Sequence, residues 1–249
     1  MTIARRFRGP PNSGNGGYVC GLLARHIPGA AEITLLRPPP LETPLTARPA
    51  KDGNWELADG ETVVAAGRAT AVAPADIVTA SFAEAAEAEA RVLIKPEQHL
   101  LPMCFVCGPE RAHGDGLRIF AGPLARPPSP HGPALAATWQ PDASLALPDG
   151  RVAPEFVWSA MDCPTGYAVS TEPATGRLDL APILLGRLAL RVDNLPAPGE
   201  RCVVTAWPTG RDGRKRTAEA ALFGGSGTLL AAARATWIVV DRQVQLGRG

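Results

Sequence analysis

A nine-residue phrase occurs twice in this chain, at 62–70 (TVVAAGRAT) and 228–236 (TLLAAARAT), with six of nine positions identical. Each copy follows a turn signal and runs into apolar sequence, which predicts the second arm of a β-hairpin. Repetition at this distance within one chain indicates an internal duplication. The sequence therefore predicts two copies of one structural unit.

The segments ahead of each copy also occur in a shared order: helix, strand, Pro-rich turn, strand, turn, repeated strand. The expected helices lie at 13–27 and 152–163, and the expected strands at 31–37, 45–50, 62–72, 185–192, 201–208 and 228–240. We predict an N-terminal half at 1–76, a linker at 77–102 and a C-terminal half at 103–249. The linker region 75–100 is rich in Ala and Glu and predicts a solvated helix.

The composition argues against nucleic-acid-binding, membrane-spanning and disulfide-rich proteins. The chain has 249 residues and a formal net charge of +1, so no global field is available to bind nucleic acid or an anionic membrane. No apolar run reaches the roughly 18–20 residues that span a bilayer, and the first residues lack the apolar core of a secretory signal. Five cysteines are too few, and odd in number, for a disulfide framework. We expect a cytoplasmic protein with neither a nucleic-acid nor a membrane partner.

One helix wrapped by an antiparallel sheet, present twice, resembles the double-hotdog acyl-CoA thioesterases. The segment CFVCGPERAHGDGLRIF at 104–120 is similar to the Cys-Phe-x-Cys-Gly lead-in of many hotdog domains, and EITLLRPPP at 32–40 looks like the strand and Pro turn of the medium-chain enzymes. The resemblance implies an α+β double-hotdog fold, an acyl-CoA or acyl-carrier thioester as substrate, and no cofactor or metal. Double hotdogs commonly associate in pairs, which leaves a homodimer open by analogy.

Relatives of the phenylacetate-pathway type open the central helix with His-Gly-Gly and carry a catalytic Asp nine residues after the His. On the first helix this motif falls on 15–17 (Asn-Gly-Gly), with Ala24 at the Asp position. On the second helix it falls on 153–155 (Ala-Pro-Glu), with Asp162 at the Asp position. Each helix therefore keeps a different part of the motif.

Thioester hydrolysis needs donors for the developing oxyanion and a base or nucleophile at the carbonyl carbon. Nine helical residues rise about 13 Å, whereas one carbonyl needs both groups within about 3–3.5 Å, so the groups must come from two helices that run in opposite directions. The first helix offers N–H donors at Gly16 and Gly17 and the amide of Asn15. We predict one site per chain, in which these donors face Asp162 as general base or nucleophile.

The symmetry-related site is expected to be inactive. Pro154 has no N–H to donate at the start of the second helix, and the Glu155 carboxylate would repel an oxyanion. Asn12 and Ser13 are the expected cap residues of the first helix. Pro164 predicts that the second helix ends or kinks just after Asp162.

Several further residues are expected to contribute to this site. Tyr18, Phe156 and Trp158 would shape an acyl tunnel between the helices. Glu155 is the alternative acid, because other hotdog branches use a Glu of this helix, and Ser159 would hold a water or orient the carboxylate. Thr236 is a candidate for binding the attacking water, as a late-strand Thr does in some double-hotdog enzymes.

The run GRDGRKR at 210–216 predicts the tip of a hairpin. Most runs of basic residues at a hairpin tip are solvated turns. In a protein that binds CoA, however, the basic side chains can bind the phosphates of the nucleotide. The candidates for this role are Arg211, Arg214, Lys215 and Arg216. Arg68 and Arg234, which match within the repeat, are expected on outer strand faces or paired with acids.

Cys104 and Cys107, with His99 and His113 nearby, have a spacing that zinc can use. The second ligand pair is irregular, so the sequence favours a tight turn with two buried thiols and no metal. A zinc-stabilised interaction module stays a third hypothesis. The chain has no serine-hydrolase elbow, nucleotide loop or dinucleotide motif. The leading hypothesis is a thioester hydrolase, and its rival is a non-catalytic acyl or small-ligand binding protein.

Overall fold

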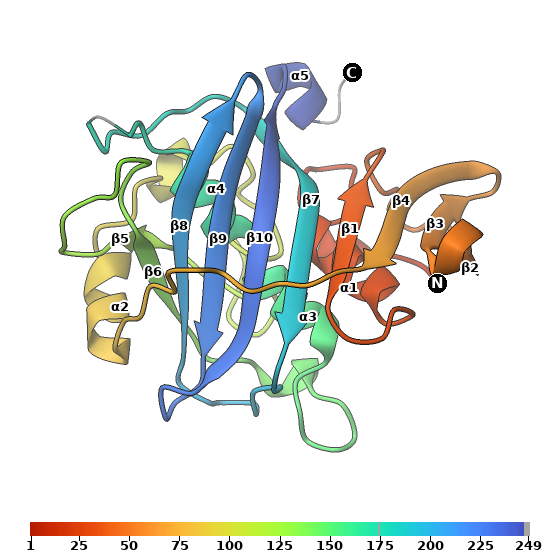
Figure 1. Ribbon diagram of the computed structural model, residues 1–249, viewed down its shortest axis with the longest axis horizontal. Helices are drawn as coiled ribbons and strands as arrows, with labels where there is room; N and C mark the ends of the chain where they lie inside the picture. Colours follow the sequence, from red (N-terminus) through yellow and green to blue (C-terminus); the bar gives the residue numbers. More distant parts are fainter. Residues whose placement is uncertain (174, 247–249) are drawn as a thin grey trace.

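The computed structural model describes residues 1–173 and 175–246; residues 174 and 247–249, within the predicted C-terminal half, lie outside the described residues. Its core is one ten-stranded antiparallel sheet in the order β2-β3-β4-β1-β7-β10-β9-β8-β6-β5 (Figure 1). The strands are β1 (Ala31–Leu35), β2 (Thr46–Pro49), β3 (Trp55–Asp59), β4 (Thr62–Ala69), β5 (Gly122–Pro123), β6 (Leu135–Trp139), β7 (Ile183–Val192), β8 (Cys202–Asp212), β9 (Lys215–Phe223) and β10 (Leu229–Val239).

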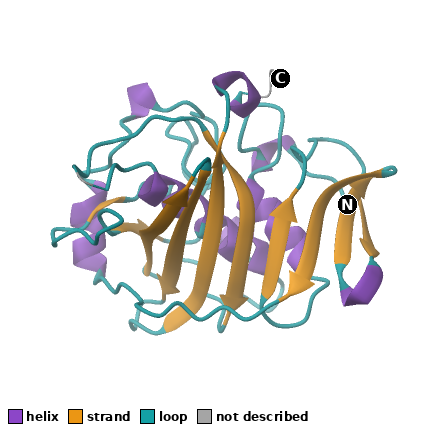
Figure 2. Cartoon of the chain, turned by 45° about the horizontal axis from the view of Figure 1, so that its top comes forward, coloured by secondary structure: helices purple, strands orange, loops and turns teal. Residues whose placement is uncertain are grey.

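Helices α1, α3 and α4 lie together against one face of this sheet (Figures 1 and 2). The helices are α1 (Gly16–Ala24), α2 (Phe82–Glu89), α3 (Pro154–Ala160), α4 (Asp162–Val169) and α5 (Arg242–Gln245), with 3₁₀ turns at Arg5–Phe7, Lys51–Gly53, Pro96–Gln98 and Ala143–Leu145. A single large apolar cluster fills the space between these helices and the sheet. None of the helices in the described ranges is both long and apolar enough to cross a membrane.

The sheet has matching arms on either side of its central pair, β1 and β7. Strands β4, β3 and β2 follow on one side, and β10, β9 and β8 follow on the other. The two copies of the repeated phrase form β4 and β10, next to the central pair. Arg68 of β4 lies opposite Glu32, Arg234 of β10 lies opposite Ala189, and Glu32 and Ala189 are partners across the centre.

Each arm contains one strand that the sequence pattern did not predict. The expected hairpin partners of β4 and β10 were the segments 45–50 and 201–208. The structure instead places β3 beside β4 and β9 beside β10, with β2 and β8 one position further out. β9 (KRTAEAALF) contains three charged residues and three Ala, and Lys, Glu and Ala have weak strand preferences. The ladder on both sides of β9 overrides that preference.

The segment that follows β4 crosses the outer face of the sheet, opposite the helices (Figure 1). Val72 packs on Ala189 and Ala232 there, and the carbonyl of Val78 accepts a hydrogen bond from Thr205. The predicted solvated helix is shorter than expected and begins only at Phe82, where Ser81 and Glu84 form a capping box. Its Ala85 and Ala88 are fully buried near β5 and β6, so this helix packs on the sheet. Small alanine side chains allow that approach.

The second predicted helix is two helices. α3 ends at Ala160, and α4 begins at Asp162, so the break falls at Met161 rather than after Asp162. Pro164 lies in the first turn of α4, where a missing N–H leaves no helical hydrogen bond unmade. Pro164 is therefore compatible with the first turn of α4 and does not end the helical segment.

Candidate active site

The N-terminus of α1 and the start of α4 meet at the side chain of Asp162. Its Oδ2 atom accepts hydrogen bonds from the N–H of Gly17 at 2.9 Å and from Nδ2 of Asn15 at 2.8 Å. These partners lie 145 and 147 residues away along the chain. The predicted proximity of Asp162 to the start of the first helix is therefore present in the structure.

Asn15 has two functions in this arrangement. It is the N-cap of α1, with Oδ1 accepting from the N–H of Tyr18 at 2.9 Å, while Nδ2 donates to Asp162. The prediction that Asn12 and Ser13 cap the helix is wrong, because α1 starts later than expected. Asn15 was expected to donate from its amide, and it donates to the carboxylate.

Asp162 is almost fully buried, with 2% of its surface exposed. Its second oxygen, Oδ1, makes no hydrogen bond within the described residues, and no described Lys, Arg or His forms an ion pair with the carboxylate. Desolvation raises the pKa of Asp162 to about 7; the Gly17 N–H opposes that rise, the nearby Cys104 sulfur adds to it, and Asn15 opposes it. One oxygen is thus anchored, and the other is left without a partner.

The glycines of α1 allow two helices to cross at close range. A Cβ at Gly17 would lie 2.6 Å from Cβ of Asp162 and 2.7 Å from the carbonyl oxygen of Trp158. A Cβ at Gly21 would lie 2.5 Å from Cα of Glu155. The expectation that Gly17 offers its N–H to a ligand is therefore corrected, because α3 and Asp162 occupy that space. Gly16 differs: it is half-buried, and its N–H makes no hydrogen bond within the described residues.

An ion pair lies at the other end of the crossing between α1 and α3. Glu155, only 5% exposed, accepts from Arg25 through both carboxylate oxygens, with 3.1 Å between Arg25 Nε and Glu155 Oε2. Arg25 follows directly after Ala24, the residue at the position of the missing acid. The structure therefore holds Glu155 on Arg25, away from Asp162, and sequence reasoning did not anticipate this partner.

Two residues predicted to line an acyl tunnel are part of a packed aromatic cluster. Tyr18 stacks on Phe7 with 4.2 Å between ring centroids, and Phe105 and Phe156 lie 6.1 and 5.8 Å from the Tyr18 ring. Trp158 is buried between the helices, with 3% of its surface exposed. These side chains fill the space beside the α1 N-terminus, so the structure holds them as packing residues rather than as walls of an open tunnel.

Ser159 and Thr236 lie away from the carboxylate. The hydroxyl of Ser159 donates to the carbonyl oxygen of Glu155 within the same helix at 2.7 Å, not to Asp162. Trp237 faces the helices and donates from Nε1 to Thr165. Because successive strand residues point to opposite faces, Thr236 faces outward and lines a hollow on the other side of the sheet. The structure therefore brings neither residue to Asp162.

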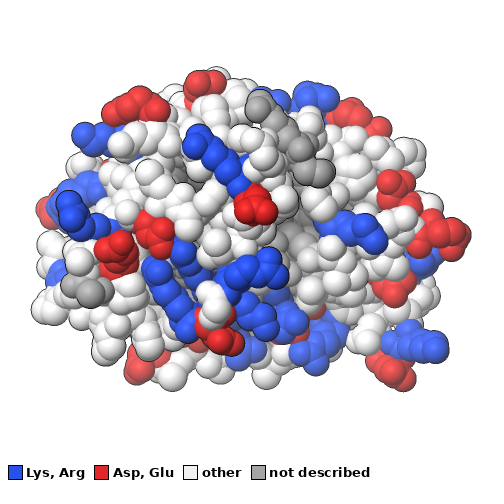
Figure 3. Space-filling model, turned by 90° about the horizontal axis from the view of Figure 1, so that it is seen from above, with Lys and Arg blue, Asp and Glu red and all other residues white. Residues whose placement is uncertain are grey.

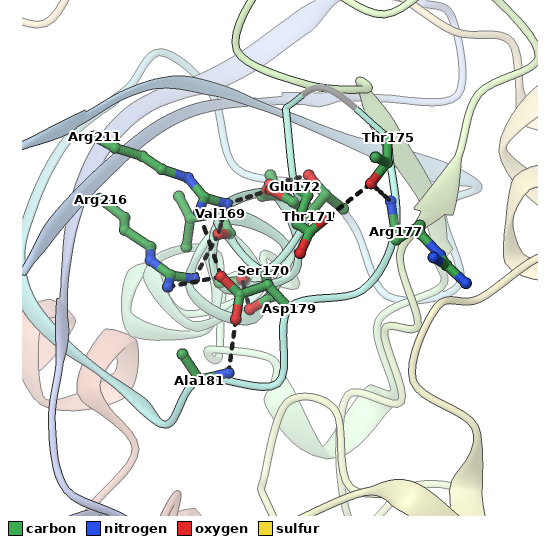
Figure 4. A network of polar contacts seen from close by, with 12 residues as sticks. Val169, Ser170, Thr171, Glu172, Thr175, Arg177, Asp179, Ala181, Arg211 and Arg216 are labelled. Atoms are coloured by element: carbon green, nitrogen blue, oxygen red, sulfur yellow. Dashed lines mark hydrogen bonds and ion pairs between the residues drawn. The ribbon is translucent and has the colours of Figure 1, made fainter.

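The basic run at 210–216 forms the tip of the β8–β9 hairpin, as predicted, but two of its cations point inward (Figure 4). Arg216 donates to the carbonyl oxygen of Val169 at 3.1 Å and pairs with Asp179 at 2.8 Å, and Arg211 donates to the carbonyls of Val169 and Thr171. Cations at the C-terminus of α4 suit its dipole. Arg211 and Arg216 thus tie down the segment after α4.

Arg214 and Lys215 are exposed at the hairpin tip. Lys215 lines the outer hollow, of about 530 Å³, together with Arg187 and Arg211. Figure 3 shows Lys and Arg side chains gathered on this end of the molecule. A phosphate-binding role for Arg214 and Lys215 stays a prediction. A phosphate bound by these two residues would lie on the outer surface of the protein.

Replacing Arg216 with Ala is expected to lower the free energy of unfolding by about 1–3 kcal/mol, because Val169 and Asp179 would lose a charged hydrogen-bond partner. Arg214→Ala, two residues away on the exposed tip, should change it by no more than about 0.5 kcal/mol. Urea denaturation of both variants measures the difference. Equal effects would show that Arg216 adds nothing beyond its neighbour.

Comparison of this chain with known proteins establishes its fold. No protein-family model matches the chain, and no curated protein sequence does. Among solved structures, it resembles the acyl-CoA thioesterase II TesB2 from Mycobacterium marinum, with a TM-score of 0.61, 13% identity, and 98% of this chain and 93% of that chain covered. It also resembles the tesB protein of Mycobacterium avium subsp. paratuberculosis, with a TM-score of 0.59, 11% identity, and 92% and 88% covered.

A third similar structure is a conserved protein of unknown function with a hotdog fold from Alicyclobacillus acidocaldarius, with a TM-score of 0.54, 10% identity, and 96% and 92% covered. At these identities the likeness establishes the fold. The chain therefore has the α+β hotdog fold found in thioesterase structures, and the resemblance predicted from the sequence is confirmed at that level.

Proposed function

We propose that this protein is a thioester hydrolase that acts on an acyl-CoA or acyl-carrier thioester, with Asp162 as general base or nucleophile. The single observation that carries the proposal is the meeting of a buried carboxylate with the N-terminus of a helix from the other half of the chain. The hotdog fold shared with the mycobacterial thioesterase structures supports the same reaction class.

The chain is further proposed to be a double hotdog, with halves at 1–76 and 103–249 joined by the linker 77–102. Support comes from the matching arms of the sheet on either side of β1 and β7. Equivalent residues Glu32 and Ala189 face each other across that central pair, as a local twofold relation requires. The helix crossing follows the same relation, with Asp162 at one end and the Arg25–Glu155 pair at the other.

The two carboxylate oxygens of Asp162 would have different roles in the reaction. Gly17 and Asn15 anchor Oδ2, which leaves Oδ1 free to take a proton from water or to attack the carbonyl carbon. In the first route the water oxygen bonds to the carbonyl carbon, and the thiolate leaves as the C–S bond breaks. In the second, an acyl-aspartyl anhydride forms and water then opens it.

The unpaired N–H of Gly16 is the proposed donor to the developing oxyanion, because the Gly17 N–H already binds the carboxylate. Since Asp162 is buried, a thioester reaches Oδ1 only when side chains at the start of α1 move. Phe7 and Tyr18, which stack over this helix end, are the proposed moving pair.

The rival function is a non-catalytic protein that binds an acyl chain or another small ligand. One observation favours it: the Gly17 N–H, a predicted oxyanion donor, is already bonded to Asp162, and the carboxylate is almost fully buried. In this reading, the contacts of Asp162 hold the two helices together.

A panel of acyl-CoA thioesters of increasing chain length tests the proposal, with free CoA followed by chromatography and binding followed by calorimetry. We expect saturable hydrolysis of at least one chain-length class, well above the uncatalysed rate. Binding without turnover across the panel, and across acyl-carrier thioesters, would instead establish the binding protein.

A further inference from the structure

Three cysteine thiols come together beside the first turn of α4. The sulfur atoms of Cys104, Cys107 and Cys163 all lie within 4.8 Å of one another, and those of Cys104 and Cys163 are 3.7 Å apart. All three residues are buried. Cys163 comes from the first turn of α4, whereas the other two come from a turn 56 or more residues earlier in the chain. The sequence pattern paired Cys104 with Cys107 but gave no third thiol.

The turn at 104–107 holds the first two sulfurs in place. The N–H of Gly108 donates to the carbonyl oxygen of Cys104 and closes the turn. A bound divalent cation would supply the counter-charge that buried thiolates need.

A second set of contacts supports this cluster. The N–H of Leu101 donates to Nδ1 of His99 at 3.1 Å, which leaves the proton of a neutral imidazole on Nε2. Nε2 of His99 lies 3.2 Å from the Tyr167 hydroxyl, and both side chains line the same cavity as the three cysteines. Polar groups fixed beside a set of ligands in this way resemble the outer-shell support of metal-ligating groups.

The spacing of the sulfurs fits a metal ion. Four thiolates around zinc at about 2.3 Å lie about 3.8 Å apart, which matches the Cys104–Cys163 distance and needs shifts of no more than about 1 Å elsewhere. The fourth position faces a cavity of about 110 Å³, lined in part by His99, Tyr167 and Trp237. We propose that Cys104, Cys107 and Cys163 form a three-thiolate site for a soft divalent metal ion of the zinc class, with the fourth position open to this cavity.

Binding releases the protons of those thiols that are still protonated to solvent, and three thiolates with one divalent ion leave a single net negative charge. The ion would fasten the turn at 104–107 to the start of α4, one residue from Asp162. His113, the other histidine considered from the sequence, is exposed and has no place in this site. The proposal does not rest on the proposed hydrolysis, because the ligands of the site do not include the reacting groups, although Cys104 lies close enough to Asp162 to influence its pKa.

The test uses the full chain purified under reducing conditions, loaded with Zn²⁺ and passed over a desalting column. Elemental analysis should find about one zinc per chain. Cobalt loaded in its place should give the intense thiolate-to-metal charge-transfer absorption of sulfur ligation. Cys163→Ser should weaken zinc binding by at least about 100-fold, and Tyr167→Phe, which removes the outer-shell hydroxyl, by about 10-fold. Cys202→Ser is the matched control: a buried thiol outside the cluster, whose loss should leave zinc binding unchanged.

A measurement on the unaltered chain guards against variants that do not fold. Titration with an organomercurial should release the zinc as three thiols react. Wild-type protein that keeps no zinc after desalting would overturn the proposal, and so would metal loss equal in the Cys202 and Cys163 variants. A Cys104–Cys163 disulfide in metal-free protein, found by peptide mapping, would overturn it as well.

Discussion

Asp162→Asn is expected to lower the rate of thioester hydrolysis by about 10²–10⁴-fold, the usual contribution of a positioned general base. The replacement has nearly the same shape, and its side-chain oxygen can still accept from Gly17 N–H. The buried carboxylate has no cation partner among the described residues, so a neutral side chain should leave the free energy of unfolding unchanged or raise it. Loss of turnover with retained stability is the expected signature.

Glu32→Gln is the matched control for this variant. Glu32 is also a buried carboxylate, 8% exposed, but it pairs with Arg68 on the face of the sheet away from the helices. Its replacement should leave hydrolysis within about 2-fold of the wild type, since Glu32 lies on the opposite face of the sheet from Asp162 and takes no part in the proposed reaction. If Asp162→Asn keeps full turnover, the proposed base is wrong, and if neither the wild type nor the variants hydrolyse any thioester, the binding protein is correct.

Gly21→Ala is expected to destabilise the fold by about 1–3 kcal/mol, in spite of the higher helix propensity of Ala. The new Cβ would lie 2.5 Å from Cα and 2.8 Å from Cβ of Glu155, so α1 and α3 must move apart. Neither helix can yield by a simple rotamer change, because the nearest atom belongs to the backbone. Thermal and urea unfolding measure the loss, and a chain of this size should melt roughly 2–4 °C lower per kcal/mol.

Gly16→Ala, five residues earlier in the same helix, is the control for stability. Its Cβ would meet the methyl groups of Leu185 and Leu35, which are the ends of flexible side chains. We expect a change of less than about 1 kcal/mol there. A Gly21 variant as stable as the Gly16 variant would show that the helix crossing tolerates a methyl group, against the close approach seen in the structure.

Sequence reasoning succeeded where the signal was local. The strands β1, β4, β7 and β10 coincide with apolar segments bounded by turn residues, and the start of α1 follows a Pro- and Asn-rich stretch. It failed at β3 and β9, and it predicted no strand at β5 or β6. The strand character of β3 and β9 depends on the neighbours that complete their ladders, and no turn or apolar run within either of these two segments reveals it.

The candidate site divides in the same way. The sequence named Asp162 and the Asn-Gly-Gly start of the first helix, because a motif of the resembling family spans both. It did not reveal that Gly17 donates to the carboxylate itself, or that Arg25 occupies the opposite end of the crossing. Nor did it reveal the third thiol of the cluster, although Cys163 stands next to Asp162 in the chain.

What the sequence determined by itself is part of the element order: a repeated helix-and-strand pattern with its chemistry divided between two helices. These features depend on spacing within a few residues, which the chain carries wherever it folds. The tertiary structure alone decided which groups touch. Side-chain direction in a strand depends on ladder register, and contact between two helices depends on how closely small residues let them approach. Both are set by residues distant in the sequence, from 19 positions in the ladder of Thr236 to 145 between Gly17 and Asp162, so Thr236 faces outward, Gly17 meets Asp162, and three separate thiols converge on one point.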